Sequence, residues 1–381
     1  MLWRLALFTL PLFIVLGIPV TLIVLSGEAT PYESIIRRQT ESRRMVLYGP
    51  AETAAEGAFK LQATIRRRPK YLVMGSSRAM AFRSRFFRDS RSFYNSGGAV
   101  SGYRHFRLFL QQIPAGQQPR IVILCLEQRY FNASSGQFML HDYETWLHKQ
   151  LNPSQVVVQG MRDMYRSVVI AHKYSIAQFL PAHHLAETRN RIGLRAIANG
   201  DGYRNDGSYC YGQFMQQPRS RNYYDYQFRD TLGRIERGDK GFQYGDDISG
   251  EALAEVRALL RYCRTHDIHV VAYIPPFAPK VLTTMQASGN YGYLEKLYPL
   301  LNPLFQENDL TLFDFTDMRT FGSSDREAID GWHGGEKAYL RLFLVMARND
   351  PVLAREVDIA ALERRLAEAP NDYDVFGEDD Y

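Results

Sequence analysis

Ser77, Asp330 and His333 have the residue types of a serine nucleophile, its general base and the carboxylate that orients the base. Ser77 stands in a Gly-Ser-Ser turn directly after the apolar run 71–74, and Asp330 precedes His333 by three residues in an Asp-Gly-Trp-His loop. A serine becomes nucleophilic when an imidazole accepts its proton and a carboxylate holds the other ring nitrogen. The set therefore predicts acyl transfer through a covalent intermediate. The serine turn and the Asp–His loop each have an ordinary interpretation as well. Gly-Ser turns are common, and an Asp–His pair at this spacing can be a surface ion pair.

The glycine-rich segment from Asn95 to Gly102 (NSGGAVSG) supplies candidate donors for an oxyanion hole. Backbone N–H groups at glycine approach a developing oxyanion without a side chain in the way. Either Gly98 or Gly102 fits this role, together with the N–H of Ser77 itself. A glycine turn that caps the following helix explains the segment almost as well.

Apolar runs alternate with helix-period segments on both sides of a polar middle region, which is typical of a parallel sheet. The expected strands lie at 71–74, 121–126, 269–274 and 310–315, and the expected helices at 103–112, 251–266, 293–306 and 335–347. Because the strands are apolar almost throughout, helices should cover both faces of the sheet. The predicted fold class is therefore α/β, a three-layer doubly wound parallel sheet. Ligands of such sheets bind at the carboxyl ends of the strands, where Ser77 and the loop of His333 both emerge.

Residues 5–26 (LALFTLPLFIVLGIPVTLIVLS) run for 22 residues without a charge. In a helix they would span about 33 Å, enough to cross the hydrocarbon core of a bilayer. We predict a transmembrane anchor here, and a cleaved signal peptide ending near Gly27 is the alternative. The rest of the chain is predicted to comprise a juxtamembrane tether or helix (27–68), the α/β domain (69–348) with an insertion over the carboxyl edge of the sheet (133–248), and a C-terminal helix with a disordered acidic tail (349–381).

The composition argues against several classes of protein. A net charge of +5 with no run of Lys and Arg longer than three residues does not favour nucleic-acid binding. The three cysteines, Cys125, Cys210 and Cys263, show neither metal-ligand spacing nor the density of a disulfide framework. No metal and no cofactor are therefore expected.

The order of the chemical segments resembles that of the SGNH (GDSL-type) hydrolases. The Gly-Ser-Ser turn, the Asn/Gly segment and the Asp-x-x-His loop correspond to the first, second and fifth sequence blocks of that superfamily, and the resemblance covers less than half of the chain. The resemblance implies an SGNH-like domain in which Ser77 is the nucleophile, His333 the base and Asp330 the carboxylate that orients the base. It also implies that the oxyanion is held by the amide of Ser77 together with that of Gly98 or Gly102.

Within that superfamily the chain looks most like the membrane-anchored D-alanyl transfer proteins and related envelope acyltransferase partners. The similarity lies in Gly-Ser-Ser in place of Gly-Asp-Ser, the N-terminal apolar segment and the large insertion. It implies a single-pass protein of the cytoplasmic membrane, with its N-terminus inside and its catalytic domain periplasmic or extracellular. The implied partners are that inner membrane, an acylated carbohydrate or envelope polymer, and a polytopic membrane-bound acyltransferase. Arg37 and Arg38 after the apolar segment slightly favour the opposite orientation, but a long translocated domain weakens that rule.

The third sequence block departs from the superfamily, because Leu126–Asn132 (LEQRYFN) lacks the usual Gly-x-Asn-Asp. Either Gln128 or Asn132 replaces the missing oxyanion donor, or the hole has two donors only. Glu127 is expected to pair with Arg78 or Arg129. The side chains expected to contact substrate are Arg78, Gln128, Asn132 and Pro276. The departure also leaves open a non-catalytic envelope protein that binds a glycan or partners a membrane-bound acyltransferase.

Overall fold

The computed structural model describes residues 21, 23–51, 56–135, 158, 162, 165–174 and 190–377. None of the helices in these ranges has both the length and the apolar character needed to cross a bilayer. Most of the predicted anchor at 5–26 lies outside the described residues, as does a large part of the insertion at 133–248.

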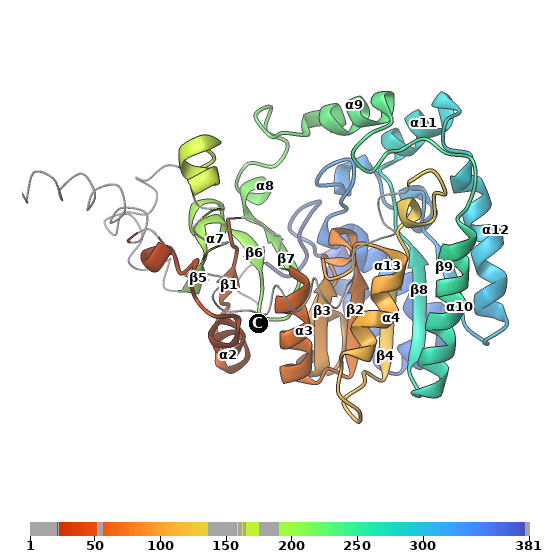
Figure 1. The fold of residues 1–381 in the computed structure, drawn as a ribbon, viewed down its shortest axis with the longest axis horizontal. Coiled ribbons are helices and arrows are strands. Elements are labelled where there is room, and N and C mark those ends of the chain that lie inside the picture. Colours follow the sequence, from red (N-terminus) through yellow and green to blue (C-terminus); the bar gives the residue numbers. More distant parts are fainter. Residues whose placement is uncertain are drawn as a thin grey trace, which may run out of the picture.

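The core is a five-stranded sheet in the order β3-β2-β4-β8-β9, and every neighbouring pair is parallel (Figure 1). The strands are β2 (Tyr71–Gly75), β3 (Phe93–Gly97), β4 (Ile121–Cys125), β8 (His269–Ile274) and β9 (Leu312–Asp314). The prediction of an α/β fold with a parallel sheet is confirmed. The chain steps from β2 outward to β3 and then returns to β4 on the other side of β2. The carboxyl ends of β2 and β4 thus form the switch point at which doubly wound sheets bind ligands.

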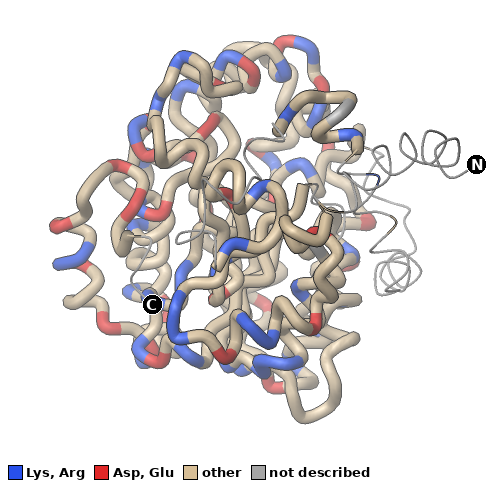
Figure 2. Tube along the Cα trace, turned by 90° about the vertical axis from the view of Figure 1, so that its left-hand side faces the viewer, with Lys and Arg blue, Asp and Glu red and all other residues tan. Residues whose placement is uncertain are grey.

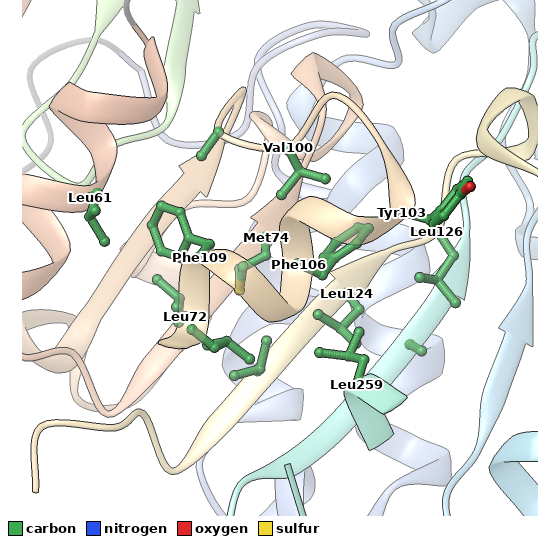
Figure 3. Packing of buried hydrophobic residues seen from close by; sticks show 14 of the residues in the cluster. Leu61, Leu72, Met74, Val100, Tyr103, Phe106, Phe109, Leu124, Leu126 and Leu259 are labelled. Atoms are coloured by element: carbon green, nitrogen blue, oxygen red, sulfur yellow. The ribbon is translucent and has the colours of Figure 1, made fainter. Parts of the chain in front are cut away.

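The alternating side chains of each strand enter two separate cores. On β2, Leu72 and Met74 pack on one face, while Tyr71 and Val73 pack on the other. This period of two explains why the strands are apolar at every position. The first face is covered by α3 (Glu56–Arg67), α4 (Tyr103–Gln111), α10 (Gly250–Thr265) and α12 (Tyr293–Gln306), and Figure 3 shows part of its packing. The second face is covered by α11 (Pro279–Ser288), α13 (Glu336–Asn349) and α15 (Ile359–Ala367).

The segment 27–68 was predicted to be a tether or a helix, and its described residues include two helices that pack into the folded domain. In α2 (Tyr32–Glu41), Ile35 and Ile36 are buried in the same core as Phe59 of α3. Between these helices, β1 (Leu47–Tyr48) joins a small sheet of order β5-β1-β6-β7, with β5 (Arg191–Ile192), β6 (Asp201–Tyr203) and β7 (Tyr209–Tyr211). Strands of two or three residues leave too short an apolar pattern to be predicted.

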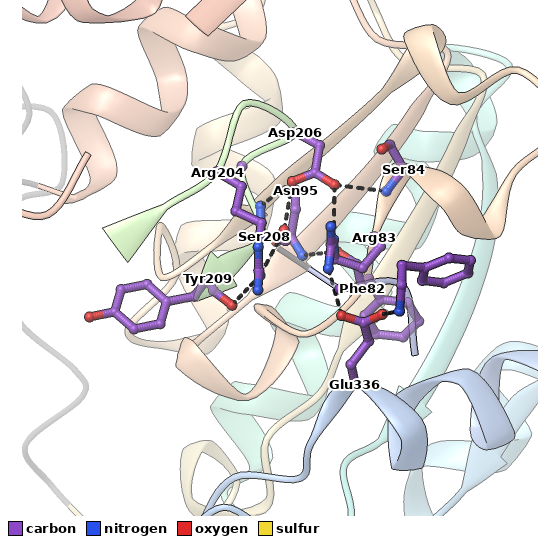
Figure 4. A network of polar contacts seen from close by, with 12 residues as sticks. Phe82, Arg83, Ser84, Asn95, Arg204, Asp206, Ser208, Tyr209 and Glu336 are labelled. Atoms are coloured by element: carbon purple, nitrogen blue, oxygen red, sulfur yellow. Dashed lines mark hydrogen bonds and ion pairs between the residues drawn. The ribbon is translucent and has the colours of Figure 1, made fainter. Parts of the chain in front are cut away.

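The small sheet lies beside the edge strand β3 in Figure 1, and the turn between β6 and β7 seals that edge. The N–H of Asn95 on β3 donates to the carbonyl of Asp206 at 2.8 Å, and the buried Lys60 ammonium donates to the Asn95 carbonyl at 2.9 Å. The side chain of Asp206 accepts from the N–H of Ser84 at 2.9 Å within a buried charge network (Figure 4). The β6–β7 part of the insertion therefore flanks the sheet, where it covers backbone groups that an edge strand would otherwise expose.

Other parts of the described insertion are short helices: α7 (Leu194–Asn199), α8 (Gly212–Gln216), the 3-10 turn Tyr226–Phe228 and α9 (Arg229–Arg237).

The C-terminal segment that follows α14 (Pro351–Ala354) and α15 packs onto the domain as far as residue 377 and is not a free tail there. Tyr373, Val375 and Phe376 are buried, and the Tyr373 carbonyl accepts from the N–H of Glu336 at 2.8 Å. The prediction of disorder is wrong there, because three buried apolar side chains offset the acidic composition. Basic and acidic residues are interspersed along the surface (Figure 2).

Candidate active site

Ser77 is presented by a tight turn at the carboxyl end of β2. The Ser76 hydroxyl accepts from the N–H of Arg78 at 3.2 Å, and the Ser77 carbonyl accepts from the N–H of Met80 at 3.1 Å. A Cβ on Gly75 would lie 2.6 Å from Cβ of Cys125, so only glycine lets the turn begin this close to β4. Ser77 is the one residue from 71 to 84 that is not buried.

The structure brings Ser77 together with His333, 256 positions later in the chain. The Ser77 Oγ lies 2.8 Å from Nε2 of His333, and Nδ1 of the same ring lies 2.9 Å from Oδ2 of Asp330. Asp330 is 3% exposed, whereas His333 and Ser77 are partly accessible. Because the carboxylate accepts at Nδ1, the neutral ring carries its proton there, and Nε2 is left to accept from the serine.

The loop from Asp330 to His333 folds around the carboxylate. Oδ1 of Asp330 accepts from the N–H of Trp332 at 2.8 Å and from the N–H of His333 at 2.6 Å. Burial alone would raise the pKa of Asp330, but the His333 charge and hydrogen bond, the Tyr224 hydroxyl and the Trp332 N–H together lower it to about 2. Asp330 is therefore ionised at every pH at which an imidazole can act as a base.

The depressed pKa makes Asp330 a pH-dependent source of stability. The unfolded carboxyl has a pKa near 3.8 and the folded one a pKa of about 2, so the stabilisation is present above the unfolded value and lost as the pH falls through the folded one. The difference amounts to about 2 kcal/mol. We expect the gap in free energy of unfolding between the native chain and Asp330→Asn to shrink by that amount from about pH 5 to pH 2. Urea unfolding checks this, and a constant gap would contradict the lowered pKa.

Of the two glycines expected to donate to an oxyanion, Gly98 is not available in this conformation. Its N–H donates to the Gly75 carbonyl at 2.9 Å, with the Gly98 backbone in the left-handed region at φ 90°. Gly98 instead ties the end of β3 to the end of β2. Gly102, with extended backbone, is the N-cap of α4. Ser77 is the first residue of its 3-10 turn, so its N–H is not needed for the hydrogen bonds within that turn. The amides of Ser77 and Gly102 are therefore the candidate oxyanion donors that remain.

Arg78, Gln128 and Pro276 form a buried brace rather than a substrate surface. The Arg78 guanidinium is 1% exposed and donates through Nη1 to Oε1 of Gln128 at 2.7 Å and through Nη2 to the Pro276 carbonyl at 2.5 Å. Nε2 of Gln128 donates to the Pro275 carbonyl at 2.6 Å. The expectation that the Arg78 and Gln128 side chains contact substrate is therefore corrected, because both are buried in a brace that joins the ends of β2, β4 and β8 beneath the serine turn. Pro276 contributes its backbone carbonyl to this brace.

Gln128→Leu should destabilise the fold by about 2–3 kcal/mol. The substitution keeps the volume but leaves Nη1 of the buried Arg78 guanidinium without its acceptor and the Pro275 carbonyl without its donor, and hydrogen bonds to charged groups are among the stronger ones. Urea unfolding measures the loss. Gln111→Leu, at an exposed position on α4, is the matched control and should change stability by less than about 0.5 kcal/mol. Equal stability of the two variants would contradict the bracing role.

Asn132 is not brought to the triad either. Its amide donates to the Gln243 carbonyl at 2.9 Å, and its Oδ1 accepts from the N–H of Ser134 at 2.9 Å, so it secures the two ends of the insertion. Glu127 pairs with Arg129 at 2.5 Å, which is one of the two partners predicted for it. The third-block segment thus contributes no described side-chain contact to Ser77 or His333.

Ser77, His333 and Asp330 have the geometry of a nucleophile, its base and the orienting carboxylate. No family model, curated protein or solved structure matches this chain. What the site can do therefore follows from its own atoms. Among the described residues, no cluster of His, Cys, Asp and Glu has the arrangement of a metal site, and the three cysteines are buried.

Three residues at the site were not predicted from the sequence. The Tyr224 hydroxyl donates to Oδ2 of Asp330 at 2.5 Å, and the Asp225 carboxylate accepts from the N–H of Gly331 at 2.8 Å. The Trp332 ring lies under the guanidinium of Arg78, whose Cζ is 4.9 Å from the ring centroid. The tyrosine-rich string 222–226 was the available signal for the first two, but its distance of about a hundred residues from the loop hid the contact.

Proposed function

We propose that this chain is a serine esterase or O-acyltransferase of the SGNH type that forms an acyl-enzyme on Ser77. The observation that carries the proposal is the continuous hydrogen-bond path from Ser77 Oγ to Nε2 of His333 at 2.8 Å and from its Nδ1 to Asp330 at 2.9 Å. The position of the serine after the first strand of a parallel sheet, and of Asp330 and His333 just before the last long helix of that sheet, supports the superfamily resemblance.

The proposed reaction has two halves. Ser77 Oγ attacks the acyl carbonyl while Nε2 of His333 takes its proton, and the resulting imidazolium is stabilised by the Asp330 carboxylate. The N–H groups of Ser77 and Gly102 hold the oxyanion, and its collapse expels the leaving alcohol or thiol, which receives the proton from Nε2. In the second half an acceptor hydroxyl or water gives its proton to Nε2 and attacks the acyl-enzyme. Collapse of the tetrahedral intermediate breaks its bond to Ser77, whose Oγ takes that proton back from Nε2.

The proposed substrate is an acylated carbohydrate or glycopolymer of the cell envelope. Aromatic rings border the site, because the Tyr211 ring lies 5.9 Å from that of His333 and the Tyr223 and Tyr224 rings are 4.7 Å apart. Such rings suit the apolar faces of sugars. The predicted anchor at 5–26 would hold the domain at the outer side of the cytoplasmic membrane, where a polytopic acyltransferase is the proposed partner. Protease added to intact spheroplasts should therefore cleave the domain.

Labelling of the full chain in membranes by a fluorophosphonate tests the catalytic part. Because the probe phosphonylates only an activated serine, peptide mass spectrometry should find the adduct on Ser77. A chain that resists the probe, while a known serine hydrolase in the same membranes is labelled, would sink the enzyme proposal. Mass spectrometry of envelope glycans with and without the protein would then identify the acyl group.

A second candidate function is a non-catalytic envelope protein that binds a glycan or a membrane-bound acyltransferase. The commitment of Gln128 to Arg78 and the Pro275 carbonyl favours it, because this residue stands where the superfamily has its third oxyanion donor. Loss of one donor typically lowers the rate by about 10²- to 10³-fold, which is compatible with a slow enzyme as well. The labelling experiment separates the two candidates.

A further inference from the structure

We propose that Tyr224 is a positioning residue of the triad, which fixes the Asp330 carboxylate so that Oδ2 faces the imidazole of His333. The inference rests on the proposed function, because it assigns a role in the same reaction. The Tyr224 hydroxyl donates to Oδ2 of Asp330 at 2.5 Å, and the same oxygen lies 2.9 Å from Nδ1 of His333. Tyrosine, aspartate, histidine and serine thus form one hydrogen-bonded row.

The contact differs in kind from the other bonds to this carboxylate. Oδ1 accepts from the N–H groups of Trp332 and His333, which belong to the same short loop and would move with it. Among the described residues, Tyr224 is the donor to Asp330 that comes from outside residues 330–333. A contact from outside the loop can set the loop and its carboxylate relative to the rest of the domain, and Tyr224 makes such a contact to the carboxylate itself.

The neighbouring Asp225 makes this external contact rigid. Its Oδ2 accepts from the N–H of Gly331 at 2.8 Å and from the Thr231 hydroxyl at 2.7 Å, and Asp225 is 2% exposed. A Cβ on Gly331 would lie 2.5 Å from Cγ2 of Thr231, so glycine is required for so close an approach. Two consecutive residues of the insertion therefore hold two consecutive residues of the catalytic loop.

The Tyr224 side chain has two parts in different surroundings. Its hydroxyl reaches the buried carboxylate, while the residue as a whole is 53% exposed and its ring packs against that of Tyr223. The exposed ring offers a competing role, which is stacking on the substrate. The two roles predict different kinetics, because positioning acts on the chemical step and stacking acts on binding.

The experiment measures fluorophosphonate inactivation of the full chain as a function of probe concentration, which separates the maximal rate of labelling from the apparent binding constant. Tyr224→Phe removes the hydroxyl and keeps the ring, whereas Tyr224→Ala removes both. Loss of a hydrogen bond to a charged group should lower the maximal rate by about ten- to a hundredfold in both variants, with the binding constant of Tyr224→Phe unchanged. Tyr226→Phe, from the same segment, is the matched control and should behave as the native chain.

The outcomes are distinguishable. A native chain that is not labelled at Ser77 removes the proposed function itself, whatever the variants do. A labelled native chain with a Tyr224→Phe variant that reacts at the native rate overturns the positioning role alone. A loss confined to the binding constant of Tyr224→Ala also overturns it and assigns the ring to the substrate. A thermal unfolding midpoint of Tyr224→Phe equal to that of Tyr226→Phe shows that the rate loss does not come from unfolding.

Discussion

Ser77→Ala should lower the rate of acyl-ester cleavage by about 10⁴- to 10⁶-fold and abolish the fluorophosphonate adduct. The reason is that alanine has no oxygen to attack the carbonyl, so the remaining rate comes only from the oxyanion donors and from binding. Turnover of a chromogenic acyl ester by the full chain in detergent measures the effect. The free energy of unfolding should change little, since Ser77 is partly accessible and its hydroxyl is hydrogen-bonded to the ring of His333, which is itself partly accessible.

His333→Ala should cost about as much as Ser77→Ala, and the double variant should be no slower than either single one. Residues that act as a unit are strongly non-additive, because removal of one already disables the step in which both take part. His269→Ala is the matched control. Its ring also pairs with a carboxylate, at 2.8 Å from Asp350, but it lies at the amino end of β8, opposite to the carboxyl edge of the sheet that carries Ser77. Additive losses, or an equal loss in His269→Ala, would argue against the triad.

The elements that could be predicted are those with long regular patterns. Apolar runs such as 121–126 identified strands. Because these runs are apolar at each position, the sequence also indicated that helices cover both faces of the sheet. The two hydrophobic cores, one on each face, confirm this. A serine after the first strand and a histidine before the last helix of the sheet then had to meet at one edge, because parallel strands end on the same side. Topology alone therefore brought Ser77 and His333 near each other.

Side-chain direction within a turn could not be predicted in the same way. Ser77 and Arg78 are adjacent, yet one is partly accessible and the other is 1% exposed and bonded to Gln128. In a 3-10 turn, successive side chains point about a third of a turn apart, so a single position decides whether a polar group meets substrate or the interior. The sequence places these polar residues at the carboxyl edge of the sheet. It does not indicate which of them, like Arg78, have hydrogen-bond partners in the interior of the protein.

Contacts made across long loops were missed for a related reason. Tyr224 stands in an irregular, tyrosine-rich segment whose path has no periodicity, and its partner Asp330 is 106 residues away. The small sheet was missed because β1 and β5 have two residues each and gain their stability from pairing rather than from pattern. Both cases concern the insertion, which therefore contributes to the fold and to the triad in ways that depend on its tertiary position.

The insertion is joined to α13 by buried charge as well. Arg83 is 1% exposed and lies between two carboxylates, with Nη1 at 2.6 Å from Oε2 of Glu336 and Nε at 3.6 Å from Oδ2 of Asp206 (Figure 4). Asp206 belongs to the turn that seals β3, and Glu336 is the first residue of α13, three positions after His333 of the triad. A buried pair of this kind contributes little when complete but is costly when one partner is removed.

Arg83→Met should therefore destabilise the domain by about 3–5 kcal/mol, because it leaves the carboxylates of Asp206 and Glu336 buried without their shared cation. The pH dependence has a definite sign. Burial already raises the pKa of Glu336 despite the opposing charges of Arg83 and Arg204, and removal of Arg83 raises it further. The folded variant then holds more protons than the unfolded chain, so its deficit in free energy of unfolding should grow from about pH 5 to pH 8.

Urea unfolding at several pH values measures this deficit, with Arg66→Met as the matched control. Arg66 pairs with Glu41 at 3.4 Å, and both side chains are exposed, at 40% and 63%, so its loss should cost less than about 1 kcal/mol at any of these pH values. A deficit in Arg83→Met that equals the control, or that shrinks as the pH rises, would show that the network does not bind the insertion to α13 by charge. A large deficit that grows with pH would mean that the loop holding Asp330 and His333 leads into a helix, α13, that is anchored by the insertion.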